Sequence, residues 1–430
     1  MKNKLTILFI LVSFLVRAQN PVPAKTQKES VIILNAIAHL GNGQIIPNAA
    51  IGFRSGKLTI VGDATRIRID KSEYPVVIDA SGKHIYPGLI ECNSTLGLTE
   101  IDLVRSTHDF NEVGEMKPNV RSIIAYNTDS KIIPTVRSNG VLLSQIVPEG
   151  GVISGQSSVV ELDGWNWEDA AFKMDEGIHV NWPRMYIVLN NPNETEEIQK
   201  QKIQSNLNAL EKFISEAKAY SMNRAPEEKN LKFEAMRGLF DGSKKLYVHC
   251  DFVKEIVNAI NLSSRFGLKM VLVGGNDSYL VADLLKEKNI SVILGRTHSL
   301  PSREDADVDL PYKIPALLKK AGVDFALSVD GSWQIRNLAF QAGTAVGYGL
   351  SKEEALTSIT LSPAKIMGID SRVGSLEVGK DATLFISDGD VLDMRTNKIT
   401  KAYIEGKEID LDNVQRQLYK KYMEKYGLKN

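Results

Sequence analysis

Strands and helices alternate regularly in the second half of this 430-residue chain, and this alternation limits the possible folds more than any other feature. Short apolar runs that end in polar residues, such as KLYVHC, predict buried strands, and the amphipathic stretches between them predict helices. Repeated units of this kind place strands in parallel with right-handed crossovers. Over about 250 residues they predict a TIM-like (β/α)8 barrel of eight parallel strands. We expect strands at 245–250, 268–275, 290–295 and 323–331, and helices at 253–266, 278–288 and 314–321.

Two strand-rich segments lie at opposite ends of the chain, at 31–62 and 381–409. Each shows short alternating apolar runs separated by turn residues, which is typical of hairpins. Neither segment buries enough surface alone, so we expect them to meet as one small β-sandwich. Two amphipathic helices, predicted at 195–220 and 412–426, are expected to pack on the rest of the protein through their apolar stripes.

The charge balance argues against a nucleic-acid partner, because 52 basic and 52 acidic residues give zero formal net charge. Residues 1–18 look like a signal peptide, with two lysines, a twelve-residue apolar run and a small-x-Ala end. We therefore expect an exported protein, periplasmic or extracellular, with no membrane span after signal removal; a retained anchor is the alternative. We expect the two cysteines, Cys92 and Cys250, to be free thiols rather than a disulfide. Both lie at the ends of predicted barrel strands, and their side chains are expected to point to separate walls of the barrel.

Two stretches of the sequence carry a family resemblance. The stretch IYPGLIECNSTLGL (85–98) resembles the first-strand signature of the amidohydrolase superfamily, in which PGLID-A leads into His-x-His. The histidine positions are occupied here by Asn93 and Thr95. Residues 336–385 resemble the same superfamily's C-terminal signature, with Thr-x-x-Pro-Ala, Gly-Ser-Leu and Gly-Lys-Asp-Ala in order. The resemblance is nearest to imidazolonepropionase-like proteins, and it implies a hydrolase of carbon–nitrogen bonds in cyclic amides or dipeptide-like molecules.

These signals together predict how the chain is divided. We expect a signal peptide at 1–18, a linker at 19–30 and a composite β-sandwich built from 31–84 and 346–409. An amidohydrolase-like barrel is expected at 85–345 and a C-terminal helix at 410–430.

The superfamily's metal ligands are two histidines on strand one, one histidine each on strands five and six, and an aspartate on strand eight. By resemblance, His249 and Asp330 match the ligands of strands five and eight. Neutral Asn93 and Thr95 oxygens bind zinc more weakly than imidazole does, so two metal ions are not expected. One divalent ion such as zinc remains possible, with further ligands drawn from His298, Asp251 or Glu91.

Each of these residues also has a structural explanation. His249 would serve as a hydrogen-bonded core histidine, Asp330 as a helix cap near Gln334 or a partner of Arg336, and His298 as a solvated loop residue. A substrate pocket is expected to use residues near the strand ends and in the STHDFNE stretch, although that stretch would also suit a charged surface loop. The pocket candidates are Asn93, Thr95, His108, Glu112 and Gln156.

Two functional hypotheses follow. In the first, Asp330 is catalytic and passes a proton from water to the leaving nitrogen, while a group near His298 or His108 stabilises the oxyanion. In the second, the chain is an inactive family member that binds a small ligand or acts as a partner subunit, as a homo-oligomer or beside an intact paralogue. Bound metal that disappears on substitution of His249 would distinguish the first hypothesis from the second.

Overall fold

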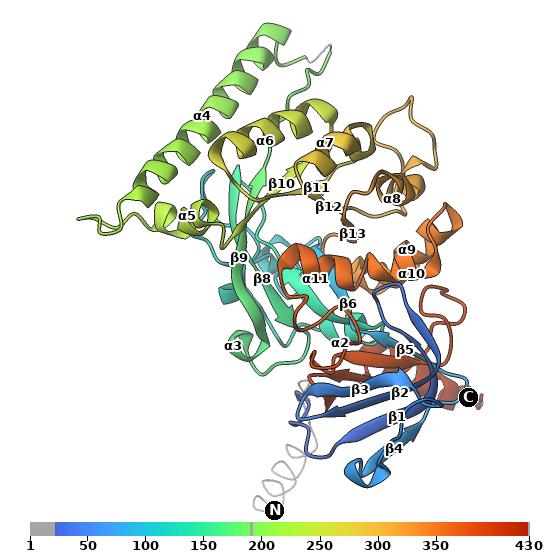
Figure 1. Ribbon diagram of the computed structural model, residues 1–430. Helices are drawn as coiled ribbons and strands as arrows, with labels where there is room; N and C mark the ends of the chain where they lie inside the picture. The colour runs from blue at the N-terminus through green and yellow to red at the C-terminus, as the bar shows by residue number, and fades with distance from the viewer. Residues whose placement is uncertain (1–21, 190–191, 429–430) are drawn as a thin grey trace, which may run out of the picture.

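The computed structural model describes residues 22–189 and 192–428, which form two eight-stranded sheets and the helices around them (Figure 1). The predicted signal peptide lies outside these residues, so export stays a prediction. No helix within the described ranges is long and apolar enough to cross a membrane.

The first sheet is the predicted barrel, with the strand order β13-β12-β11-β10-β9-β8-β7-β6. Between its first and last strands, the Thr95 backbone N–H donates to the Gly331 carbonyl at 2.9 Å. The Ser328 hydroxyl donates to the Cys92 carbonyl at 2.6 Å, which nearly closes the ring. Its strands are β6 (Leu89–Ser94), β7 (Val141–Ile146), β8 (Ile153–Glu161), β9 (Ala171–Asn181), β10 (Lys245–Cys250), β11 (Met270–Gly274), β12 (Ser291–Leu294) and β13 (Phe325–Leu327).

The fold class is therefore confirmed, but one detail of the prediction is wrong. Strand β8 runs antiparallel to both β7 and β9, whereas the other neighbouring pairs are parallel. Six residues separate β7 from β8, and nine, including the single-turn helix α3 (Trp167–Ala170), separate β8 from β9. Both connections are shorter than the roughly dozen residues that a helical crossover needs. A short connection of this kind forces adjacent strands to reverse direction.

Helices surround the barrel. The predicted helix at 253–266 is confirmed with the same bounds, as α6 (Val253–Phe266). The others are α2 (Ile133–Arg137), α3 (Trp167–Ala170), α4 (Glu196–Met222), α5 (Leu231–Asp241), α7 (Ala282–Glu287), α8 (Leu310–Ala321), α9 (Leu338–Gly347), α10 (Lys352–Thr357), α11 (Leu361–Met367) and α12 (Val414–Lys425).

The second sheet combines the two ends of the chain, as predicted. Its order is β16-β15-β14-β5-β1-β2-β3, with β4 paired to β1. In Figure 1 the blue amino-terminal strands and the red carboxyl-terminal strands lie side by side. Strand β5 runs almost directly into barrel strand β6 through Gly88, where an added Cβ would lie 2.9 Å from Leu142 and Thr383. The strands are β1 (Val31–His39), β2 (Ile45–Arg54), β3 (Lys57–Asp63), β4 (Val76–Asp79), β5 (His84–Pro87), β14 (Leu384–Ser387), β15 (Ile399–Ile404) and β16 (Lys407–Glu408). The predicted domain boundaries remain a prediction.

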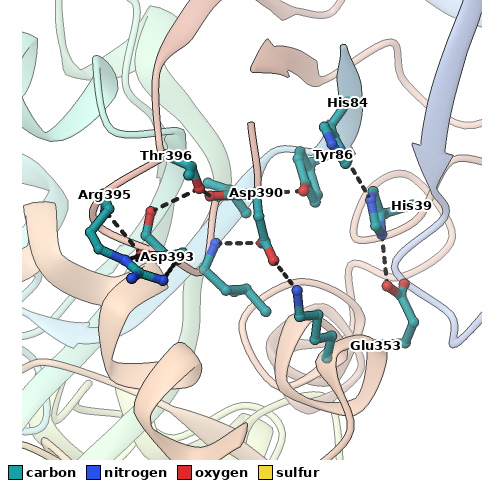
Figure 2. Close-up of polar contacts among 11 residues, drawn as sticks. His39, His84, Tyr86, Glu353, Asp390, Asp393, Arg395 and Thr396 are labelled. Carbon is teal, nitrogen blue, oxygen red and sulfur yellow. Dashed lines mark hydrogen bonds and ion pairs between the residues drawn. The ribbon is translucent and has the colours of Figure 1, made fainter. Parts of the chain in front are cut away.

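A row of polar side chains joins this sheet to the barrel's helices (Figure 2). His39 Nδ1 lies 2.7 Å from the Glu353 carboxylate of α10, and its Nε2 lies 3.0 Å from His84 Nδ1. The His39 ring also stacks on Tyr86, with 4.5 Å between ring centroids. Nearby, Lys352 pairs with Asp390 at 2.6 Å. Strands β1 and β5 are thus held against α10 by charge-assisted contacts.

The two amphipathic helices behave differently. Helix α4 buries Leu210, Ile214 and Ala217, as its stripe predicted. In α12 no residue is buried, and both Leu418 and Tyr422 are exposed, so the predicted packing of that helix is wrong. The helix is attached through polar contacts instead, such as the Thr135 hydroxyl donating to the Gln415 amide oxygen at 2.7 Å. The expectation of free thiols is confirmed for both cysteines.

Candidate functional site

A cavity of about 550 Å³, here called the rim pocket, opens where the barrel strands reach their carboxyl ends. Chemistry in barrels of this kind gathers at that face. The polar residues of its wall come from β6, β9, β10 and the loops after β7, β9, β10 and β13, and they include Asn93, Glu149, Asn181, Arg184, His249, Asp251 and Asp330. A smaller hollow of about 260 Å³ shares Asp251 and Asp330 and adds Arg296.

Asp330 and Asn93 form the polar pair of this pocket. Both adopt left-handed backbone conformations, with φ of 56° and 53°, which directs their side chains differently from those of a regular strand. The Asn93 amide donates to Asp330 Oδ1 at 2.9 Å. Although solvent reaches Asp330 inside the pocket, desolvation by the surrounding protein raises the pKa of its carboxyl, against the opposing effects of Asn93 and Arg296. A carboxyl with a raised pKa exchanges protons more readily near neutral pH.

His249 is paired with a second histidine that the sequence analysis did not single out. His179, from β9, places Nδ1 2.8 Å from His249 Nε2, and its ring stacks on Tyr247 with 4.6 Å between centroids. Desolvation lowers the pKa of His249 to about 4 and that of His179 well below its usual value, so both rings are neutral. One feature of the sequence could have identified His179: it is a polar residue inside the apolar strand run GIHVNWP.

Below the pocket lies a buried carboxyl, Glu176, which the sequence analysis also missed. It accepts hydrogen bonds from the Gln145 amide at 2.5 Å, the Ser157 hydroxyl at 2.8 Å and the Tyr247 hydroxyl at 2.8 Å. Burial raises its pKa despite these donors. The Gln145 amide oxygen in turn accepts from the Asn93 backbone N–H at 3.0 Å, so this network supports the pocket floor.

Two other predicted ligands lie near the site but serve different contacts. Asp251 lines the pocket, accepts from the Asn276 backbone N–H at 3.3 Å and has a pKa raised by burial. Glu91 is fully buried and accepts from the Ser328 hydroxyl and the Val329 N–H at 2.7 and 2.8 Å, so it ties β6 to β13 rather than lining the pocket. Its burial raises the pKa to about 8.

The remaining predicted residues do not line the rim pocket. His298 Nε2 lies 2.5 Å from the Thr344 hydroxyl, and His108 Nε2 lies 3.2 Å from the Ile101 carbonyl. The Gln156 amide oxygen accepts from the Lys244 ammonium. Glu112 is exposed on the loop after β6, and Thr95 is buried beneath the rim. The structure therefore brings together His249, Asp330, Asp251 and Asn93 from the predicted set.

The donor set of the pocket does not fit the metal centre that the resemblance implies. Among the described residues, no group of three or more His, Cys, Asp or Glu side chains is arranged to hold a metal ion. His249 Nε2 is engaged by His179, and one Asp330 oxygen is engaged by Asn93. A catalytic zinc ion requires three protein ligands and an open position.

Comparison with known proteins identifies relatives of one kind. The model of the amidohydrolase family matches residues 199–409. Imidazolonepropionase from Rhizobium rhizogenes is 25% identical over 380 residues, which cover 81% of this chain and 88% of that protein. Amidohydrolase tasK from Hapsidospora irregularis is 33% identical over 114 residues, but these span only 12% of its length.

Solved structures show the same fold. An amidohydrolase from Thermotoga maritima MSB8 superposes with a TM-score of 0.77 at 23% sequence identity, covering 88% of this chain and 99% of that one. Its fold matches over the barrel and the composite sheet together.

Proposed function

Because this chain belongs to the amidohydrolase superfamily, we propose that it is a hydrolase that opens a carbon–nitrogen bond of a small cyclic amide or dipeptide-like molecule held in the rim pocket. The observation that supports this most directly is the convergence of Asp330, Asn93 and His249 on one cavity at the carboxyl ends of the strands. A cavity of about 550 Å³ suits a small molecule.

Asp330 is the proposed general base. It would take a proton from the water that attacks the carbonyl carbon, and it would return that proton to the leaving nitrogen. The hydrogen bond from Asn93 orients the carboxylate, and its raised pKa suits both steps near neutral pH. The neutral pair His249 and His179 shapes the wall without adding charge.

Two donors are available for the oxyanion that develops in this reaction. Trp182 lines the pocket, and its buried Nε1–H has no hydrogen-bond partner within residues 22–189 and 192–428, so it could serve once substrate binding brings an acceptor against it. The exposed Arg184 guanidinium stacks over Tyr186 at 5.0 Å and pairs with no carboxylate in the same ranges. Preorganised donors aimed at developing charge are a major source of rate enhancement.

Proteins of this superfamily usually use metal ions, which activate water in their active sites. Since the residues present do not fit such a centre, no step proposed here passes through a metal ion. We propose that His249 and Asp330 hold neither one zinc ion nor two.

A second candidate function is supported by the same pair of residues. Asn93 donates to Asp330 where the superfamily has a metal-binding imidazole, which would suit a barrel that binds a small ligand without hydrolysing it. Both candidate functions place a small molecule in the rim pocket, and they differ only in whether the bound molecule is hydrolysed.

The test combines turnover with binding. Purified protein would be incubated with cyclic amides and N-acyl amino acids, and ring opening or amine release would be followed by mass spectrometry. Asp330→Asn is expected to lower turnover by at least about a hundredfold, because general-base catalysis contributes that much. The matched control Asp283→Asn, an exposed residue of α7, should leave turnover unchanged. Ligand binding without turnover would support the second candidate and overturn the first.

Metal dependence is tested separately. Treatment with a chelator is expected to change neither turnover nor the unfolding midpoint. Stoichiometric zinc that disappears in His249→Ala protein would contradict the metal-free mechanism.

A further inference from the structure

A second cavity lies at the opposite end of the barrel from the rim pocket. This cavity of about 580 Å³, here called the basal pocket, is bounded by the amino-terminal ends of β10, β11 and β12, by the turns after α6 and α7, and by α8 and α11. It shares no residue with the rim pocket. A ligand in it would therefore not touch the proposed reaction site.

The basal pocket is strongly cationic. A single acidic residue lines it, Asp324, whereas five lysines do: Lys245, Lys269, Lys288, Lys319 and Lys365. Such an excess of one charge in a concave surface raises the local concentration of ions of the opposite charge.

Only part of this charge is neutralised by the protein. Lys288 pairs with Glu287 at 2.9 Å, and Lys319 lies 3.6 Å from Glu354. Within the described ranges, the other three lysines pair with no carboxylate. Lys269 donates to the Gly242 carbonyl at 2.8 Å and Lys245 donates to the Ile366 carbonyl, whereas the Lys365 ammonium makes no hydrogen bond to any residue that the structure describes.

Hydroxyl donors lie among these lysines. Ser291 at the start of β12 and Ser362 on α11 both line the basal pocket, and neither side chain is bonded to another described residue. Ammonium and hydroxyl groups are the donors that proteins use to hold phosphate oxygens. We propose that the basal pocket binds a small phosphate-bearing anion, and that this site is separate from the one where hydrolysis takes place.

Stabilisation of helix ends explains why some of these lysines are present, but it does not explain why all five line one cavity. Lys319 lies in the last turn of α8 and Lys365 in the last turn of α11, where a cation stabilises the helix terminus. Lys245 begins a strand and Lys269 lies in a loop, so this effect does not explain them. Five separate parts of the chain deliver positive charge to one cavity of ligand size.

Calorimetric titration of the full chain with pyrophosphate tests the proposal. We expect one binding site per chain, weakened by added salt because the attraction is ionic. The double variant Lys269→Gln with Lys365→Gln should bind roughly tenfold or more weakly, since it removes two charged donors. The control double variant Lys200→Gln with Lys421→Gln removes the same charge from exposed positions outside the basal pocket and should bind as the unmodified chain does.

Circular dichroism and thermal unfolding without ligand would show whether the double variant folds. If the double variant does not fold, the single variant Lys365→Gln is titrated in its place, because the Lys365 ammonium makes no hydrogen bond among the described residues. Absence of pyrophosphate binding at millimolar concentration, or equal weakening in the control variant, would overturn the proposal. Binding that persists in Arg184→Gln protein, which lacks the guanidinium lining the rim pocket, would place the anion away from that pocket.

Discussion

Single side chains in this protein are tuned mainly by burial. Glu161 ends β8 at the base of the barrel and is almost completely buried, with one carboxylate oxygen unpartnered in the described part of the chain. Burial, and then the neighbouring Glu405, raise its pKa to about 8, and Lys407 at 3.6 Å opposes this only in part. A group of this kind makes stability depend on pH.

The sign of that dependence follows from the two pKa values. An unfolded chain loses the Glu161 proton near pH 4.5, whereas the folded protein keeps it to about pH 8, so the free energy of unfolding falls as pH rises through this window. Glu161→Gln does not titrate, and we expect it to be more stable than the unmodified chain at pH 9, by on the order of 1–3 kcal/mol, but not at pH 5. Urea unfolding at both pH values measures this, with exposed Glu228→Gln as the control. An equal difference at both pH values would contradict it.

Among the elements, α9 shows how closely the barrel's helices approach the composite sheet. Gly343 faces the loop between β14 and β15, and a Cβ added there would lie 2.1 Å from the Leu392 carbonyl oxygen. Four residues later in the same helix, Gly347 has nothing within 4 Å of such a Cβ. The helix therefore offers two glycines with opposite surroundings.

We expect Gly343→Ala to lower the free energy of unfolding by about 1–3 kcal/mol, because the backbone of the loop must move to accept the methyl group. Gly347→Ala should be neutral or stabilising by up to about 1 kcal/mol, because alanine favours helix more than glycine does. Chemical denaturation of both variants checks this, and similar changes in the two would show that the close contact with Leu392 is unimportant.

As a whole molecule, the protein depends on its two chain ends meeting. Strand β14 pairs with β5 from Leu384↔Pro87 to Ser387↔His84, and β5 continues into the barrel. The polar row of His84, His39 and Glu353 adds a second link between sheet and helices (Figure 2). Neither part of the composite sheet is complete without the other.

Truncation after residue 383 removes β14, β15 and β16, and it uncovers the buried side chains of Ile85 and Tyr86. We expect this form to be insoluble or unfolded, because β5 keeps only its short pairing with β1, loses β14 and exposes an apolar edge. Truncation after residue 417 removes most of α12, which buries none of its residues, and should leave a folded protein. Soluble yield and circular dichroism distinguish the two, and a folded, soluble shorter form would contradict this view of the sheet.

Much of the fold could be predicted because its signals are local. The helix at 253–266 follows from apolar spacing along a few turns, and the strand runs of the barrel from short buried segments. The direction of β8 could not be predicted in the same way, because it depends on which strands it pairs with. The exposure of α12 escaped prediction for a related reason, since an apolar stripe does not show what surface is available to cover it.

Less of the candidate site could be predicted. His249 and Asp330 were identified because they lie at predicted strand ends that match ligand positions of the superfamily the chain resembles, and both line the rim pocket. Their hydrogen bonds were not predicted: His179 was missed, and Asn93 was predicted as a pocket residue but not as the partner of Asp330, because these partners lie 70 and 237 positions away along the chain. Hydrogen bonds across such separations exist only after the strands are assembled.

The amino-acid sequence alone determined the class of architecture, because periodic burial and turn chemistry act between residues that are close along the chain. Only the tertiary structure decided which polar groups neutralise one another and which remain available. It paired His249 with His179 and Asp330 with Asn93, and it gathered five lysines into one basal pocket. Electrostatic and hydrogen-bond energies depend on distance in space, and distance in space is set by the packed fold.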